Sequence, residues 1–220
     1  MVWPMSWNRH KDKKSRKGYH HGNLREALID AALGLIAKKG PEGFTFAEAA
    51  REAGVSAAAP YRHFKDREEL VLEVARRGFE KFADRLTRAW EGEKPDGEPN
   101  AAERLKGVGQ AYLDFARTET ALFSAMFESG IPVTADRDLN KASDAAFSVV
   151  QQAAEEICAT IEKSPRPPAL MVALHIWSMT HGIASLFARG DNARRTLPMP
   201  PEDLLEAGVL LYLDGLGVPR

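Results

Sequence analysis

Apolar side chains recur along most of the chain at intervals of three and four residues, the spacing of one face of an α-helix. The first such stripe consists of Leu24, Leu28, Ala31 and Leu35. It stops at Gly40, a residue typical of helix ends. Asn23, Thr45 and Asp66 each stand three residues before a glutamate, the capping-box spacing that begins a helix. The pattern therefore predicts helices that begin near residues 23, 45 and 66.

The longest apolar stripe runs from Asp66 to about Trp90 and predicts a helix roughly 37 Å long, at about 1.5 Å per residue. Residues 91–100, rich in glycine, proline and acid, predict a linker. Further helices are expected over 101–117, 119–128, 140–162, 169–189 and 201–215. No segment shows the β-branched alternation of a strand, so we expect an all-α chain with about nine helices in total.

The composition is that of an ordinary folded chain, with 220 residues, 44% hydrophobic and 28% charged. The single cysteine, Cys158, excludes an internal disulfide and a cysteine-based zinc cage, which favours a reducing compartment. No uninterrupted apolar run reaches the ~18 residues that span a bilayer. The first ten residues lack the apolar stretch of a signal peptide. We therefore expect a soluble, cytoplasmic protein without a membrane-spanning segment.

The net charge of −1 conceals an asymmetry between the two ends of the chain. Residues 1–70 hold 13 Lys and Arg against 9 Asp and Glu, a balance of +4, so the remainder carries −5. The segment 9–25 alone holds seven basic residues and one acid. A basic N-terminal arm favours a polyanionic partner for that end of the molecule, although a merely solvated tail has the same composition.

Residues 45–64, TFAEAAREAGVSAAAPYRHF, have the spacing of a helix-turn-helix. Two crossing helices need a small residue at their contact and a residue that tolerates positive φ in the turn, and Ala50 and Gly54 supply these. Ser56 is expected to cap the second helix, which would enter the major groove, and Pro60 removes one early hydrogen bond from it. The same spacing arises by chance in short helices, so it indicates DNA binding only together with the basic arm and the three caps.

The segments GYHHGNLREALIDAALGLIAKKG and FTFAEAAREAGVSAAAPYRHFKDREELVLEVA resemble the DNA-binding domain of the TetR family of transcriptional regulators. A weaker match, IWSMTHGIASLF at 176–187, resembles the Trp-His-Gly signature of one C-terminal subclass. The resemblance implies a helix-turn-helix domain over 18–82, after the basic flexible arm at 1–17. It also implies a helical ligand-binding and dimerisation domain over 83–220.

The same resemblance implies phosphate contacts by Thr45, Tyr61, His63, Lys65 and Arg67. It places Ala47, Ala57, Ala58 and Ala59, next to Ser56, where side chains usually face bases. Tyr61 has an alternative role as a half-buried ring that props the helix. Because alanine makes no bidentate hydrogen bond to a base, we hypothesise that specificity comes from thymine methyls, DNA shape and the arm in a minor groove. Arg62 is the one side chain of that helix suited to pairing with guanine.

Beyond residue 101 the chain carries aromatic stripes that are core in most helical proteins, and a ligand cavity is expected among them. The candidate lining residues are Phe115, Met126, Phe127, Phe147, Trp177 and His181. We expect His181 to be a pocket or carbonyl-bonded histidine, not a metal ligand, because His175 lies on another face of the helix. Helices 169–189 and 201–215 combine small and apolar residues that suit a two-fold dimer.

The expected protein is a homodimeric, sequence-specific regulator, most often a repressor among proteins of this kind. We expect it to bind a pseudo-palindromic double-stranded operator, with half-sites ~34–36 Å apart, and to be released by a small, mostly apolar effector. No cofactor, metal or catalytic residue is expected. A transcriptional activator of the same fold is the alternative. An all-α enzyme is less favoured because common catalytic motifs are absent from the sequence, and a helical adaptor would lack salt-sensitive affinity for DNA.

Overall fold

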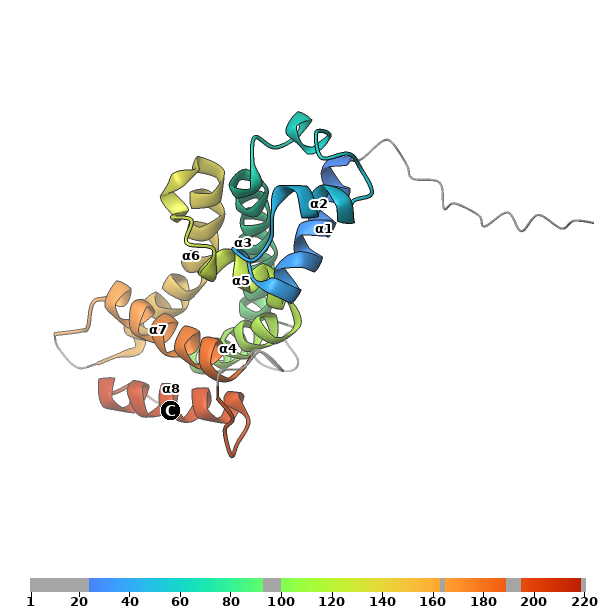
Figure 1. Cartoon of the computed structure of the whole chain (residues 1–220). Coiled ribbons are helices and arrows are strands. Elements are labelled where there is room, and N and C mark those ends of the chain that lie inside the picture. The colour runs from blue at the N-terminus through green and yellow to red at the C-terminus, as the bar shows by residue number, and fades with distance from the viewer. Residues whose placement is uncertain (1–23, 93–99, 163–164, 189–194, 219–220) are drawn as a thin grey trace, which may run out of the picture.

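The computed structural model describes residues 24–92, 100–162, 165–188 and 195–218 (Figure 1). Its α-helices are α1 (Leu24–Lys39), α2 (Phe46–Glu52), α3 (Arg67–Glu91), α4 (Ala101–Thr118), α5 (Thr120–Glu128), α6 (Arg137–Thr160), α7 (Ala169–Phe187) and α8 (Pro201–Leu216). Two short 3-10 helices, η1 (Pro60–Arg62) and η2 (Val133–Ala135), are also present. All regular structure in the described ranges is helical, which confirms the predicted all-α class.

The predicted caps begin helices where the structure describes them. Thr45 and Glu48 form a complete capping box at α2, and Asp66 accepts a hydrogen bond from the Glu69 amide at 2.9 Å at the start of α3. Asn23 lies outside the described residues. The predicted helix 140–162 begins three residues earlier, at Arg137, because the Asp136 carboxylate accepts from the amides of Asp138 and Leu139.

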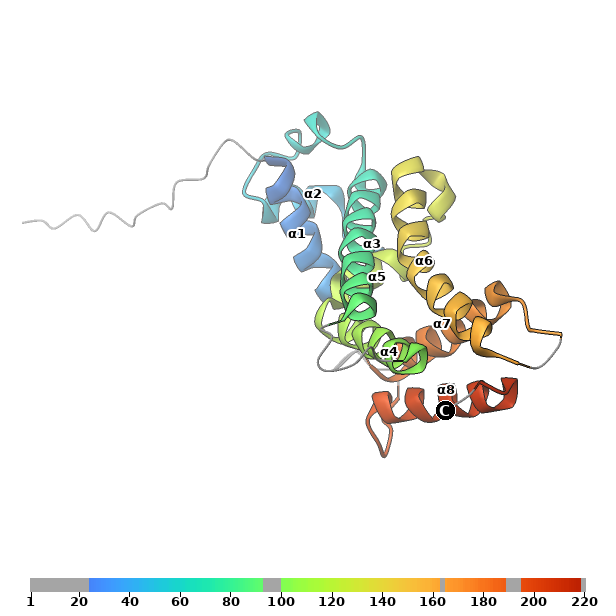
Figure 2. The same cartoon turned by 180° about the vertical axis from the view of Figure 1, so that it is seen from behind.

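Helix α3 is the central helix of the structure. It packs along α6, α4 and α5 and also contacts α1. In Figures 1 and 2, α1, α2 and η1 lie at one end of the molecule and α8 lies at the opposite end. The predicted domain boundary at residue 82 falls inside α3, so one continuous helix belongs to both predicted domains.

The core follows the buried face of α3, with Leu70, Val74, Phe82 and Leu86 all fully buried. Gly78, on the same helix, allows a close approach to α5: a Cβ atom there would lie 2.8 Å from the Cγ and Sδ atoms of Met126. Because real Cβ contacts are longer than this, glycine at position 78 is what lets α5 sit against α3.

Helix α7 has the length and composition of a membrane-spanning helix, with 19 residues and a mean hydropathy of 1.4 over an 18-residue window that is 28% buried. It is the one such helix among the described residues. α7 packs against α6, α4 and α8. His175, Ser178, Thr180 and His181 interrupt its apolar run.

Candidate functional site

The N-terminal part of the site is the helix-turn-helix formed by α2 and the segment after it. The Thr45 hydroxyl accepts from the Glu48 amide at 3.2 Å, and the Glu48 carboxylate accepts from the Thr45 amide at 2.9 Å. Lys39 of α1 donates to Glu48 at 2.7 Å, and this bond, with the one from the Thr45 amide, lowers the pKa of Glu48 to about 2. Gly54 has a φ of +72°, so the turn after α2 favours glycine there.

The segment after this turn is not the α-helix that the sequence analysis expected. The Ser56 carbonyl accepts from the Ala59 amide at 3.0 Å in a tight turn, and only the 3-10 helix η1 follows. Pro60 has no N–H to donate to the Ser56 carbonyl, so the α-helical ladder fails at its first step. η1 has no side-chain cap, so the expected capping by Ser56 is also wrong. Phe64, which is buried, anchors the end of the segment.

Most residues assigned to DNA contact are exposed on α2 and the segment 56–65, and we call this set the reading surface. It consists of Thr45, Ala47, Ser56, Ala57, Ala58, Tyr61, Arg62, His63 and Lys65. Ala59 is half-buried. The ring of Tyr61 meets Phe46 edge-on at 5.0 Å while the residue stays 63% exposed. The ring is thus not the half-buried prop of the alternative: it touches Phe46 and leaves the side chain accessible to a partner.

Arg67 differs from the other predicted phosphate contacts. It is half-buried and donates to the Pro41 carbonyl, and its guanidinium lies 5.7 Å from the centre of the Phe44 ring. These contacts tie the start of α3 to the connection between α1 and α2. A phosphate contact by Arg67 stays a prediction, and the structure gives this residue a packing role.

Behind the reading surface a group of charged residues joins α1 to α3, and we call it the arginine clamp. It consists of Arg25, Glu26, Glu73, Arg76 and Arg77. The Glu73 side chain is 8% exposed and accepts from Arg25 at 3.0 Å and from Arg76 and Arg77 at 2.8 Å. Burial raises the pKa of Glu73, but these three donors outweigh it and hold the pKa at about 2.

The clamp makes two further contacts, one with α1 and one with the segment that follows α2. Arg77 of α3 pairs with Glu26 near the start of α1. The guanidinium of Arg25 lies 5.3 Å from the centre of the Phe64 ring, at the end of the reading segment. These directional contacts add to the apolar packing of Leu28, Phe64 and Leu70, which belong to the same buried core.

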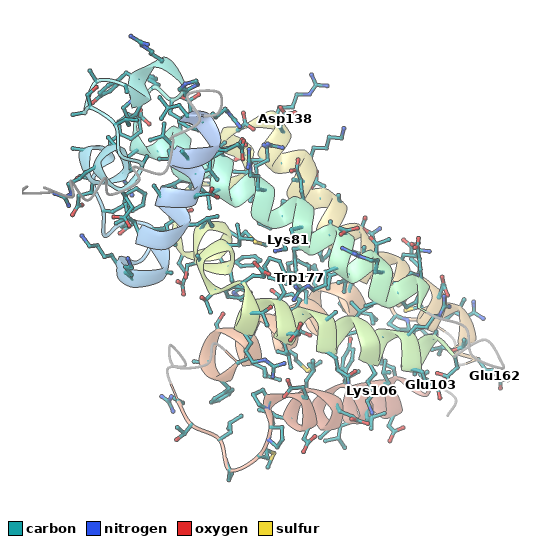
Figure 3. All side chains as sticks on the ribbon, turned by 90° about the vertical axis from the view of Figure 1, so that its right-hand side faces the viewer. Lys81, Glu103, Lys106, Asp138, Glu162 and Trp177 are labelled. Atoms are coloured by element: carbon teal, nitrogen blue, oxygen red, sulfur yellow. The ribbon has the colours of Figure 1, made fainter. Side chains whose placement is uncertain are left out.

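In the C-terminal part, rings from five helices pack together, with Trp177 in the interior of the bundle (Figure 3). Trp177 lies 5.4 Å from Phe147 and 5.5 Å from Tyr112, measured between ring centres. We call this the ring cluster, and it consists of Phe82, Tyr112, Phe115, Phe123, Phe127, Phe147, Trp177 and His181. It brings together five of the six predicted ligand residues, whereas Met126 packs on Gly78. The rings pack against one another and so fill the space between the helices.

His181 is the polar member of the ring cluster. Burial raises the pKa of Tyr112 and lowers the pKa of His181, so the phenol keeps its proton and the imidazole is neutral. The Tyr112 hydroxyl then donates to Nδ1 of His181 at 2.8 Å, and Nε2 faces the Ser185 hydroxyl at 3.3 Å. His181 is thus bonded to side chains and not to a carbonyl. Within the described residues no three His, Cys, Asp or Glu side chains form a possible metal site.

Beside the ring cluster a cavity of about 60 Å³ lies between α4, α6, α7 and α8. Of the six predicted ligand residues, Trp177 lines it. Its other walls are mostly apolar and include Val108, Ile176, Leu205 and Val209. Lys106, at the junction of α4 and α8, pairs with Glu206 at 2.7 Å on its rim (Figure 3).

The sequence analysis missed the arginine clamp and, apart from Trp177, the residues that line this cavity. Glu73, Arg76 and Arg77 stand at helical i, i+3 and i+4 spacing, which was a readable signal. Arg25 lies 48 residues away, so its part in the clamp could be found only in three dimensions. Gly109, inside a predicted helix, was a weak sign of a close helix contact, and in the structure Leu205 of α8 packs there.

Two family models match the chain. "Bacterial regulatory proteins, tetR family" matches residues 28–74, and "Tetracyclin repressor-like, C-terminal domain" matches residues 105–212. Together they account for more than half of the 220 residues. The first covers the helix-turn-helix and, of the clamp, Glu73, and the second covers the cavity and all of the ring cluster except Phe82.

Curated proteins match mainly in the N-terminal part. The HTH-type transcriptional regulator BetI of Agrobacterium fabrum is 46% identical over 52 residues, which are 24% of this chain and 25% of that protein. An uncharacterized HTH-type transcriptional regulator of Haemophilus influenzae is 47% identical over 51 residues, 23% of this chain and 25% of that protein. The chain thus spans about a quarter of the length of these relatives.

Solved structures match over nearly the whole chain. A protein of unknown function from Rhodococcus sp. RHA1 has a TM-score of 0.72 and 31% identity, covering 91% of this chain and 98% of that one. FadR from Bacillus subtilis, in complex with stearoyl-CoA, has a TM-score of 0.65 and 16% identity, covering 89% of this chain and all of that one. With its helix-turn-helix head and helical C-terminal domain, this chain belongs to the TetR family of DNA-binding transcriptional regulators.

Proposed function

We propose that this protein is a homodimeric repressor that leaves its operator when a small, mostly apolar molecule binds the C-terminal domain. The observation that carries the proposal is the continuity of α3, whose first half is held in the arginine clamp and whose second half packs in the ring cluster. When the side chains around the rings repack, the shift is transmitted along α3, one stiff helix, and moves the reading surface. The two reading surfaces of a dimer then no longer match successive major grooves.

We propose that the reading surface contacts DNA as the sequence analysis predicts. Thr45, Tyr61, His63 and Lys65 contact phosphates, and the alanines face bases and touch thymine methyls. The basic arm at 1–17, which lies outside the described residues, supplies further specificity from a minor groove. Deleting residues 1–17 is expected to weaken discrimination between operator and random DNA more than Arg62→Ala does. The opposite order would contradict the role of the arm.

The dimer is proposed to form through α7 and α8. Large apolar side chains are exposed on both helices, including Leu170 and Leu174 of α7 and Leu211 of α8, which is 74% exposed. Leu205 and Leu213 of α8 are buried within the chain. The outer face is therefore built from the other residues of these helices, and a second copy related by a two-fold axis would cover it.

The effector is proposed to act on the ring cluster and its surroundings. The apolar rings, with the Tyr112–His181 pair as a polar element, suit a mostly apolar molecule. FadR from Bacillus subtilis shows that a protein of this fold binds a ligand with a long apolar chain. Trp177, His181 and Gly182 carry the proposed membership of the Trp-His-Gly subclass. We place the protein in the cytoplasm, where its DNA lies.

A binding assay with the DNA that flanks the coding region tests the proposal. It is run at two salt concentrations with excess nonspecific competitor. We expect competitor-resistant binding whose log–log slope against salt is about −0.9 for each phosphate neutralised. Failure of a folded dimer to bind this DNA, or any DNA recovered by selection from a random pool, would contradict the proposal.

A reporter gene driven by the bound DNA separates repression from activation. We expect reporter expression to rise when the regulator is absent. A fall in expression would instead identify an activator of the same fold.

A further inference from the structure

Three exposed side chains of the reading surface stand between two buried residues. Tyr61, Arg62 and His63 are exposed, whereas Pro60 and Phe64 on either side of them are buried. The amides of His63 and Phe64 both donate to the Pro60 carbonyl, at 2.9 and 3.0 Å, so residues 60–64 form one compact turn. A shift of the Phe64 side chain therefore moves the three exposed side chains with it.

The turn belongs to residues 56–65, which we call the reading segment. The regular structure of this segment is the three-residue 3-10 helix η1. A short 3-10 turn has few hydrogen bonds of its own, so its direction depends on what its ends contact. Apolar packing keeps Phe64 buried, but the hydrophobic effect is not directional. A directional contact on the Phe64 ring is therefore the feature that can set the direction of the turn.

Arg25 of α1 makes such a contact. Its guanidinium lies 5.3 Å from the centre of the Phe64 ring, within the range of a cation–π interaction. The same guanidinium donates to Glu73 of α3 at 3.0 Å. One side chain thus connects α1, α3 and the reading segment. Because a charge-assisted hydrogen bond fixes the guanidinium, the Phe64 ring meets a planar group of defined orientation.

Glu73 is itself held in place by its own helix. Arg76 donates to both of its carboxylate oxygens, at 2.9 and 2.8 Å, and Arg77 donates at 2.8 Å. A buried carboxylate with this many donors keeps one arrangement, so Arg25 has an acceptor in a fixed place. Of the three arginines that donate to Glu73, Arg25 is the one that comes from α1 and also contacts the reading segment.

A phosphate contact is the competing role for Arg25. Its side chain is 40% exposed, and the residue belongs to the basic segment 9–25. The guanidinium is, however, shared between the Glu73 carboxylate and the Phe64 ring. To reach a phosphate it would leave a buried carboxylate with one donor fewer, which is costly. The contacts therefore favour positioning over direct binding.

We propose that Arg25 is a positioning residue for operator recognition: held by Glu73, it orients Phe64 and with it the exposed side chains of the reading segment. This inference rests on the proposed function, since it concerns how the proposed reading surface is held. It gives the arginine clamp a role in sequence discrimination in addition to stability. Loss of Arg25 then lowers the preference for the operator and leaves the general affinity for DNA unchanged.

Binding titrations with two duplexes of equal length test the proposal. One is an operator recovered with the wild type by selection from a random pool, and the other is its scrambled sequence. For Arg25→Gln we expect about tenfold weaker binding of the operator, at most about twofold weaker binding of the scrambled duplex, and an unchanged salt slope. Loss of a phosphate contact would weaken both duplexes alike and lower the slope by about 0.9, and this result would overturn the proposal.

Glu73→Gln separates the two roles a second time. A positioning role predicts that this variant loses operator preference about as much as Arg25→Gln, and that the double variant is no worse than either single one. A phosphate-binding Arg25 would instead be released by Glu73→Gln, and operator binding that stays equal or tightens would contradict positioning. Phe64→Leu keeps an apolar side chain without the ring and is expected to match Arg25→Gln. It replaces Glu73→Gln if that variant does not fold.

Arg76→Gln is the matched control. It removes an arginine of the same clamp whose contacts, with Glu73 and Glu80, both lie within α3. We expect its operator preference to stay within about twofold of the wild type even if its stability falls. Circular dichroism at the assay temperature establishes that each variant is folded. Equal losses of preference in Arg76→Gln and Arg25→Gln would show that the clamp acts through stability alone, and the positioning role would fall.

Hydrogen exchange without DNA separates this inference from the proposed function. Relative to the Phe82 amide in α3, the amides of His63 and Phe64 are expected to exchange at least about fivefold faster in Arg25→Gln than in Arg76→Gln. Faster exchange in a protein whose wild type binds no DNA would contradict the proposed function and leave the hold of Arg25 on the reading segment standing. Unchanged exchange and unchanged operator preference would contradict the inference and leave the regulator standing.

Discussion

The two halves of α3 are held by different kinds of contact. In the first half, Glu73 is surrounded by three arginines, two from α3 and one from α1. In the second half, Phe82 is fully buried and packs against Tyr112, Phe115 and Trp177. The apolar core holds both halves, with Leu70 and Val74 buried in the first, so what sets the halves apart is the charge-assisted hydrogen bonds of one and the ring packing of the other.

This difference has a consequence for signalling. Hydrogen bonds to Glu73 have narrow ranges of distance and angle, so the clamp favours a small number of discrete arrangements of α1 on α3. Ring packing is less directional and tolerates small rearrangements, provided the volume is filled. Ring packing in the second half of α3 is therefore expected to rearrange more readily than the hydrogen bonds around Glu73 in the first half.

The largest effect is expected at the ring end. Phe82→Ala removes a ring that contacts three others and should lower the free energy of unfolding by about 3–5 kcal/mol, as for other buried Phe→Ala changes. Urea denaturation measures this loss. Phe147→Ala, at a half-buried ring, is the control and should cost less. A smaller loss for Phe82→Ala than for Phe147→Ala would break the comparison.

The next effect is expected in the clamp, and it should depend on pH. Glu73→Gln should lower the free energy of unfolding by about 1–3 kcal/mol at neutral pH, because three arginines lose a shared charged acceptor. The folded pKa of about 2 lies below the ordinary value of 4.5, so this stabilisation is present above pH 4.5 and is lost as the pH falls toward 2.

Urea denaturation of the wild type and Glu73→Gln across that pH range measures the convergence. Glu80→Gln, an exposed member of an ion pair with Arg76, is the matched control and should change stability little. The loss caused by Phe82→Ala should stay constant over the same range. A pH-independent loss for Glu73→Gln would show that the clamp acts by packing alone.

A local effect of about 1 kcal/mol is expected at the start of α2. Thr45→Ala removes the hydroxyl that accepts from the Glu48 amide, and loss of an N-cap costs about that much. Thr45→Ser keeps the acceptor and should restore most of the stability. Thermal unfolding of the three proteins measures the difference, and equal losses for Ala and Ser would exclude the cap as the cause.

The smallest effect on stability is expected on the reading surface, where the change should appear in DNA binding. Lys65→Gln should leave the free energy of unfolding within about 0.5 kcal/mol of the wild type and lower the slope of log affinity against log salt by about 0.9. Binding titrations at several salt concentrations measure the slope. Lys38→Gln, exposed at the far end of α1, is the control and should leave the slope unchanged.

Features set by neighbours in the sequence were predictable. The caps at Thr45 and Asp66 depend on residues three positions apart, and both begin helices where expected. The end of α3 near Trp90 and the bounds of α5 and α7 followed from apolar periodicity and breakers. The family resemblance, drawn from the same segments, agrees with the family models.

Features set by distant contacts were not predictable. Arg25 joins the clamp from 48 residues away, which no local pattern reveals. Candidate ligand residues such as Phe115 and Phe127 were chosen by size and spacing, which do not tell rings that line a cavity from rings that fill it. The cavity itself arises where α8 returns to α4, roughly a hundred residues later in the chain.

The alanines of the reading surface also have a consequence for protein engineering. Ala57 and Ala58 are exposed, and the family resemblance places them where side chains usually face bases. A longer side chain introduced there displaces no existing contact within the protein, so it is expected to add a base preference without removing an existing one. This helix-turn-helix is therefore a suitable starting point for building regulators with chosen operators.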